Sequence, residues 1–139
     1  MGNENCVLAR GIRNNNPGNI RHGDLWQGLC PDQSDKDFCT FLSPEYGVRA
    51  MARILLNYKK RHGLNTIHGI ISRWAPLSEN DTASYIKAVS AACHVNPTEV
   101  IDVAEYLPDL IPAIIHHENG VQPYDMATIH SGIALALKE

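Results

Sequence analysis

The sequence has no long apolar run, no excess of basic residues and no leader-like start. No stretch approaches the roughly 18 apolar residues of a membrane-spanning helix, so no membrane span is expected. Residues 1–10 lack the basic start and apolar core of a signal peptide, so we expect synthesis in the cytoplasm. The 12 basic and 15 acidic residues give a formal net charge of -3, which argues against nucleic acid as a partner.

Cysteine spacing typical of zinc sites is also lacking. The chain contains no CxxC pair, and His116-His117 alone is a poor metal site. Cys30 and Cys39 flank a polar loop and could form a disulfide after export, whereas both thiols are expected to stay reduced in the cytoplasm. We predict no metal and no cofactor, and free thiols are the simpler expectation at Cys6, Cys30, Cys39 and Cys93.

The chain has room for one domain and one hydrophobic core. Its 139 residues contain no internal repeat, so residues 1–139 are predicted to fold as a single domain. Residues 11–41 are polar and punctuated by glycine and proline, which predicts turns and a short β-hairpin. The remainder carries apolar side chains at helical spacing, which predicts a mainly α fold.

Capping residues mark the expected helix boundaries. One helix should begin at residues 43–45, run to about Arg61 and end at Gly63. A second should begin after residues 65–66 and stop before Pro76, because the residue before a proline avoids helical geometry. Further helices are expected after Asn80-Asp81, after the capping box Asn96-Pro97-Thr98-Glu99, over Leu110–His117, and from Asp125 to about Leu137.

Three polar clusters are richer in special residues than plain connections require. The first, residues 10–21 with residues 26–28, offers asparagine amides for sugar hydroxyls and an indole ring for a sugar face. An asparagine-rich turn bonded to its own backbone would explain the amides equally well. The second cluster, residues 73–76 with residues 79–82 and Tyr85, lies where one helix ends and another begins, although helix capping alone would account for residues 80–82.

The third cluster, residues 114–124, places Glu118 at the end of an apolar helix. Because a proline fits only the first turn of a helix, the regular part of that helix is expected to begin with the turn that contains Pro112 or later. The helix should end at residues 118–120. An acid near the negative end of a helix dipole is favoured in its protonated form, which is the form that glycosidic cleavage requires. A solvent-facing glutamate at a helix end is the competing interpretation.

Three strings together resemble a family of small phage and prophage proteins in the lysozyme-like superfamily: RGIRNNNPGNIR, FLSPEYGVRAMARIL and RWAPLSENDTASYI. The resemblance covers most of the chain and implies a lysozyme-like helical domain that cleaves the glycan strands of peptidoglycan. Flagellar-type glucosaminidases carry a similar order of motifs, on which the following positions fall: Asn15 to Arg21, Trp26, Phe41 with Ser43, Trp74 with Ala75, and Tyr85.

The position of the catalytic acid departs from that pattern. The glucosaminidases place their glutamate on a helix before the asparagine-containing turn, where this chain offers only Glu4. Lytic transglycosylases instead carry a helix-ending Glu-Ser-Gly segment, which Glu118-Asn119-Gly120 resembles. We therefore expect a circularly permuted order in which Glu118 is the catalytic acid.

In the mechanism that this resemblance implies, Glu118 protonates the glycosidic oxygen and an oxocarbenium-like centre develops. Water would complete the reaction in a muramidase and the sugar's own hydroxyl in a lytic transglycosylase. Tyr85 is expected to assist, and Glu79 or Glu45 is a candidate second carboxylate. The predicted substrate-binding residues are Asn15, Asn16, Asn19, Arg21, Trp26, Arg73 and Trp74.

Two other functions remain open from the sequence. A non-catalytic phage structural or glycan-binding protein would keep the groove without turnover. A helical DNA-binding protein would use Arg49, Arg53 and residues 59–61, but the charge balance disfavours it. If the substrate is the cell wall, a holin, a virion or a secretion apparatus must deliver the protein there.

Overall fold

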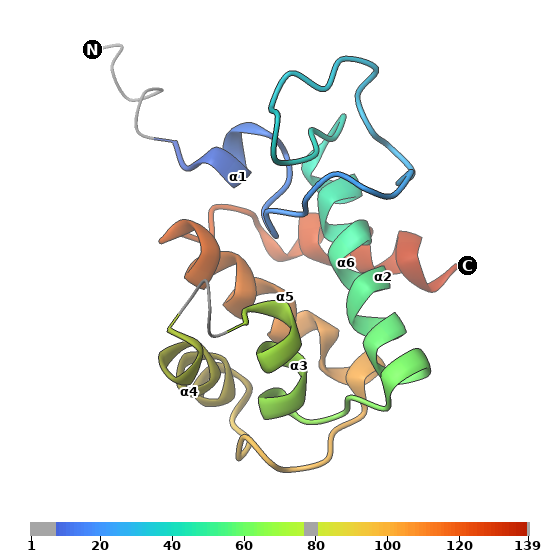
Figure 1. Ribbon diagram of the computed structural model, residues 1–139. Coiled ribbons are helices and arrows are strands. Elements are labelled where there is room, and N and C mark those ends of the chain that lie inside the picture. The colour runs from blue at the N-terminus through green and yellow to red at the C-terminus, as the bar shows by residue number, and fades with distance from the viewer. Residues whose placement is uncertain (1–7, 77–80, 139) are drawn as a thin grey trace.

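The computed structural model describes residues 8–76 and 81–138, and these residues form a mainly helical fold (Figure 1). The helices are α1 (Arg10–Arg13), α2 (Pro44–His62), α3 (Ile67–Trp74), α4 (Thr82–Cys93), α5 (Val103–Asn119) and α6 (Met126–Leu137). The predicted mainly α class is thus confirmed. The expected hairpin is reduced, in the part of the chain described, to two isolated antiparallel bridges, Arg21 with Phe38 and Leu29 with Phe41.

Helix α2 follows its sequence signals closely. Pro44 occupies its first turn, and Gly63 caps its end in the left-handed conformation with a φ of 66°. Its buried face packs along α6, where Gly132 lies against Val48. Figure 1 shows the long loops before α2 gathered at its N-terminal end. This arrangement brings the asparagine-rich turn toward the interior of the molecule.

Local caps also confirm three further helix starts. Thr66 accepts a hydrogen bond from the Gly69 N–H at the start of α3, and Asp81 accepts one from the Ser84 N–H at the start of α4. Asp125 caps α6 in the same way through the Thr128 N–H. These side chains act within one turn of the helix, which is why sequence alone located them.

The prediction of a helix directly after Asn96 is wrong. The Asn96 N–H donates to Glu99 Oε1 and the Glu99 N–H donates to Asn96 O, but these bonds close a turn that does not continue as a helix. The Ile101 N–H instead donates to Asn65 O at 2.9 Å, which keeps the chain extended until Asp102 caps α5. A long-range backbone bond has therefore moved the helix start beyond the capping box.

Helix α5 is longer than predicted and contains both Pro108 and Pro112. Each internal proline costs about 3 kcal/mol through its lost N–H and its ring clash. The helix nevertheless buries an apolar face that includes Leu107, Leu110, Ile111, Ile114 and Ile115. Burial of this face offsets the proline cost, since each fully buried aliphatic side chain contributes roughly 1.5–3 kcal/mol.

The end of α5 is as expected, because Gly120 closes it in the left-handed conformation with a φ of 77°. This cap fixes Glu118 in the last helical turn, beside the loops that pack on α2. Among the described residues, none of the helices is both long enough and apolar enough to cross a bilayer.

Candidate functional site

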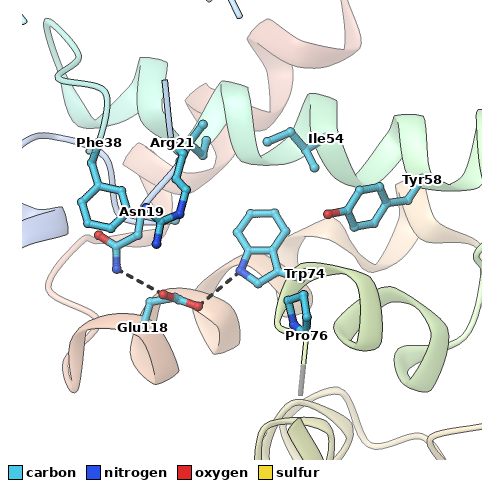
Figure 2. A pocket seen from close by; sticks show the side chains of 10 residues that line it. Asn19, Arg21, Phe38, Ile54, Tyr58, Trp74, Pro76 and Glu118 are labelled. Atoms are coloured by element: carbon cyan, nitrogen blue, oxygen red, sulfur yellow. Dashed lines mark hydrogen bonds between the residues drawn. The ribbon is translucent and has the colours of Figure 1, made fainter. Parts of the chain in front are cut away.

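A groove of about 670 Å³ lies where the asparagine-rich turn, α2, α3 and α5 meet. Figure 2 shows side chains from all four segments facing this space, with Glu118 at one side of it. The lining residues are Gly18, Asn19, Ile20, Arg21, Phe38, Ile54, Tyr58, Trp74, Pro76 and Glu118. All three polar clusters of the sequence therefore contribute to this groove or to its support.

The carboxylate of Glu118 accepts three hydrogen bonds. Tyr85 Oη donates to Glu118 Oε2 at 2.9 Å, and Trp74 Nε1 donates to the same oxygen at 3.3 Å. Asn19 Nδ2 donates to Glu118 Oε1 at 3.1 Å (Figure 2). A carboxylate offers about four acceptor positions, two on each oxygen. Oε2 is thus fully used, and Oε1 keeps one position for a proton or a substrate hydroxyl.

Tyr85 is fully buried and donates a hydrogen bond to Glu118. Burial raises the pKa of Tyr85 well above its usual range, and the negative charge of Glu118 and the hydrogen bond to it act in the same direction. The phenol therefore stays protonated and donates. Its ring stacks on the His117 ring with centroids 3.8 Å apart, which fixes the direction of the hydroxyl.

The asparagine turn is shaped so that Asn19 can reach Glu118. Asn19 has a φ of 51°, a left-handed conformation that asparagine tolerates better than most residues. Behind it, Asn16 is fully buried, accepts a hydrogen bond from the Ile20 N–H, and donates to Ile20 O and Cys39 O. Asn119 joins the turn to α5 by donating to Pro17 O at 2.8 Å.

Gly11 in α1 lies directly behind these asparagines. A Cβ at this position would lie 2.6 Å from Asn119 Oδ1 and 2.7 Å from Asn19 Oδ1. Only glycine allows α1 to approach the turn and α5 so closely. Gly11 and Asn119 support the asparagine turn, a role that was not predicted for them. The sequence signal for Gly11 was its position shortly before an asparagine run.

The predicted residues divide into two groups in the structure. Asn19, Arg21, Trp74 and Glu118 line the groove, and Tyr85 lies against Glu118. Asn15 and Asn16 instead serve the turn itself: Asn15, with a φ of 53°, donates to Phe41 O, and Asn16 has no exposed surface. These two amides therefore fit the alternative interpretation, in which the asparagines of this turn bond to backbone groups rather than to a sugar.

Trp26 and Arg73 line a second depression, of about 690 Å³, that adjoins the first. The two share Ile20, Ile54, Tyr58 and Pro76. Glu45 lines neither depression, and Glu79, the other candidate carboxylate, lies outside the described residues, as does Glu4.

Aromatic and apolar walls of the groove were not predicted. Phe38 lies beneath two guanidinium groups, with Arg10 Cζ at 4.6 Å and Arg21 Cζ at 5.0 Å from its ring centroid. Tyr58 and Ile54, both on α2, also line the groove. Trp74 was expected to bind substrate, and in the structure its indole also donates a hydrogen bond to Glu118.

The described cysteines are free thiols at Cys30, Cys39 and Cys93. Burial raises the pKa of the Cys39 thiol and raises that of Cys93 to about 11, so neither is activated as a thiolate. Over residues 8–76 and 81–138, no three histidine, cysteine or acidic side chains gather in a cluster able to hold a metal ion.

The chain is 42% identical over 128 residues to Protein P5 of Pseudoalteromonas phage PM2, a match that covers 89% of this chain and 79% of that protein. No protein-family model matches the chain.

Proposed function

The chain belongs to the family of Protein P5 of Pseudoalteromonas phage PM2, and we propose that it cleaves the glycan strands of bacterial peptidoglycan with Glu118 as general acid. The proposal includes a lysozyme-like fold with a circularly permuted order of motifs. It is supported by the sequence motifs, the groove and the hydrogen bonds around Glu118.

The observation that carries the proposal is the one unused acceptor position on Glu118 Oε1. Tyr85 and Trp74 occupy both positions on Oε2, and Asn19 occupies one on Oε1. A proton on Glu118 therefore belongs on Oε1, the oxygen whose partner Asn19 lines the groove. A general acid needs its proton within hydrogen-bond reach of the leaving oxygen, and this orientation supplies it.

In the proposed reaction, Glu118 Oε1 transfers its proton to the glycosidic oxygen as the bond from that oxygen to the anomeric carbon breaks. The bonding electrons leave with the oxygen, and the sugar becomes oxocarbenium-like. Attack by water would give a reducing end, and attack by the sugar's own hydroxyl would give an anhydro sugar. The ionised Glu118 produced by proton transfer is stabilised by its three donors, because hydrogen bonds to a charged group are stronger than those to a neutral group.

The walls of the groove suit a glycan. Trp74, Phe38 and Tyr58 offer aromatic faces, while Asn19 and Arg21 offer polar groups for hydroxyls and N-acetyl groups. A mixed lining of aromatic surface and a few oriented polar groups is typical of ligand sites. We further propose that the protein reaches the wall by delivery from a phage or a secretion apparatus, with the periplasm as its place of action.

The test is digestion of purified peptidoglycan by the wild type and by Glu118→Gln, with the released fragments identified by mass spectrometry. Anhydro-muramic products from the wild type indicate a lytic transglycosylase, and reducing-end products indicate a muramidase. Glu118→Gln should release neither at a comparable rate while keeping the wild-type circular dichroism spectrum. Equal cutting by both proteins would show that the acid lies elsewhere.

A second candidate is a non-catalytic phage structural or glycan-binding protein. It is favoured by one observation: among the described residues that line the groove, Glu118 is the sole carboxylate. The described lining thus offers no second carboxylate as nucleophile or base. Binding of glycan strands without release of any fragment by the wild type would make this the better description.

A further inference from the structure

The groove at Glu118 continues into a depression with a cationic wall. Arg61 and His62 reach this depression from the end of α2, and Arg73 reaches it from the end of α3. Asp24 is the acidic residue among its described lining side chains. Among these described residues, two arginines therefore face a single carboxylate at a concave surface.

These arginines are not neutralised by a described acidic side chain. Arg10 forms ion pairs with Asp35 and Asp37, whereas neither Arg61 nor Arg73 pairs with an acidic side chain among the described residues. Both are exposed, and Arg73 Cζ lies 5.5 Å from the centroid of the Tyr58 ring. Stacking on a ring orients a guanidinium while leaving its N–H groups available.

The cationic wall is connected to Glu118 by a short series of side chains. Tyr58 lines both depressions, and Trp74, next to Arg73 on α3, donates to Glu118. In Figure 2, Trp74 lies between Glu118 and Tyr58. A chain molecule bound at Glu118 could therefore extend over Trp74 and Tyr58 to reach Arg73. The two depressions form successive sites for one extended ligand.

We propose that this second depression is a subsite for a carboxylate carried by the glycan substrate, with Arg73 and Arg61 as the residues that bind it. The inference rests on the proposed function and deepens it by naming the substrate class: acid-substituted glycans are selected over neutral ones. Guanidinium groups bind carboxylates through paired charge-assisted hydrogen bonds, which a neutral sugar cannot match. In peptidoglycan the carboxylate belongs either to the attached peptide or to the lactyl group of a muramic acid residue without a peptide, because an attached peptide converts the lactyl carboxylate into an amide.

The experiment measures binding of soluble glycan fragments to Glu118→Gln, so that the fragments stay intact. Three ligands of equal length are compared: a peptidoglycan fragment, the same fragment with its carboxylates converted to carboxamides, and a neutral N-acetylglucosamine oligomer. The peptidoglycan fragment should bind about tenfold more tightly than the other two, since hydrogen bonds to charged groups are the strong ones. Raised salt should reduce that advantage.

Arginine variants in the same background locate the subsite. Arg73→Gln and Arg61→Gln should each remove most of the advantage of the charged fragment over the neutral oligomer. Lys60→Gln is the matched control, because Lys60 is exposed on the same helix and lines neither depression. It should behave like its parent. If either single change gives only a partial loss, the double arginine variant should remove the remaining advantage of the charged fragment.

The outcomes separate this inference from the proposed function. Equal binding of charged and amidated fragments, or equal behaviour of the arginine and Lys60 variants, overturns the subsite even if the wild type cleaves peptidoglycan. Binding that depends on charge and on Arg73 supports the subsite even if the wild type cleaves nothing. Strands stripped of peptides expose the lactyl carboxylate and then separate the sources: retained discrimination shows that the subsite accepts the lactyl carboxylate, and lost discrimination shows that it requires a peptide carboxylate.

Discussion

Glu118 derives its geometry from donors on three separate segments of the chain. Asn19 belongs to a turn, Trp74 to the end of α3 and Tyr85 to α4. Because each donor is held by its own local structure, the carboxylate cannot rotate without losing a bond. Such preorganisation is what general acid catalysis requires of its surroundings.

Tyr85→Phe tests one of these donors. The change removes the hydroxyl that donates to Glu118 Oε2 and keeps the ring that stacks on His117. We expect cleavage to slow by about 10- to 100-fold, since hydrogen bonds to charged groups contribute roughly 1.5–3 kcal/mol. The measurement is the initial rate of fragment release, with thermal unfolding as the control for folding. A rate equal to that of the wild type would show that the hydroxyl is dispensable.

Tyr124 gives a pH-dependent prediction. Burial, followed by the charge of Glu45, raises its pKa to about 12, and its hydroxyl is buried without a partner among the described residues. Because the folded pKa lies above the unfolded value of about 10, this tyrosine contributes stability below pH 10 that is lost as pH rises toward 12. Tyr124→Phe should make the alkaline decline in unfolding temperature shallower. Superimposable profiles for the two proteins between pH 9 and 12 would contradict this.

At the scale of elements, close approach of helix backbones supports the site. Helix α1 contacts α5 where Gly11 faces Asn19 and Asn119. Helix α6 contacts α2 where Gly132 faces Val48. The first contact lies behind the groove and the second lies on the far side of α2. Added methyl groups should therefore affect activity at one position and stability at the other.

Gly11→Ala should reduce cleavage more than it reduces stability. Its Cβ would meet Asn119 Oδ1 and Asn19 Oδ1 at 2.6 and 2.7 Å, so Asn19 must move away from Glu118. We expect a fall in fragment release close to that of Asn19→Ala, because both changes remove the same donor from Glu118 Oε1. Rates measured for both variants below their unfolding temperatures test this. Wild-type activity in Gly11→Ala would mean that the turn adapts without displacing Asn19.

Gly132→Ala should have the opposite profile. Its Cβ would lie 2.5 Å from Val48 Cβ and 2.8 Å from the Glu45 backbone oxygen, so α6 must shift from α2. Overpacking of this kind costs about 1–3 kcal/mol, which exceeds the gain in helix propensity of about 1 kcal/mol. We expect a lower unfolding temperature with cleavage retained at low temperature. Ser131→Ala, at an exposed neighbouring position, is the matched control.

For the whole molecule, the sequence predicts what short-range contacts decide. Thr66, Asp81, Asp125 and the terminal glycines act within one helical turn, so the helix ends were found. Helix α5 was underestimated because burial of its apolar face outweighs its two prolines, and burial is a long-range property. The same holds for the turn after Asn96, which a backbone bond from Ile101 to Asn65 extends.

The candidate site follows the same division. Residue types identified Glu118, Trp74, Tyr85 and Asn19 as special, but nothing local indicates that all four meet. Asn16 resembles Asn19 in sequence and lies inside the turn, because the direction of each amide depends on how the loop packs against Cys39 and Ile20. The walls from α2 were missed because helical periodicity alone does not distinguish a face packed on the core from one facing a groove.

The central claim is that Glu118 supplies the proton for glycan cleavage. The most direct measurement is the rate of fragment release by Glu118→Gln, with binding of the same glycan strands measured on the same preparation. The account predicts a fall in rate of at least about 100-fold, the usual contribution of a general acid, with binding changed by no more than a few fold. Undiminished cleavage by Glu118→Gln would contradict it.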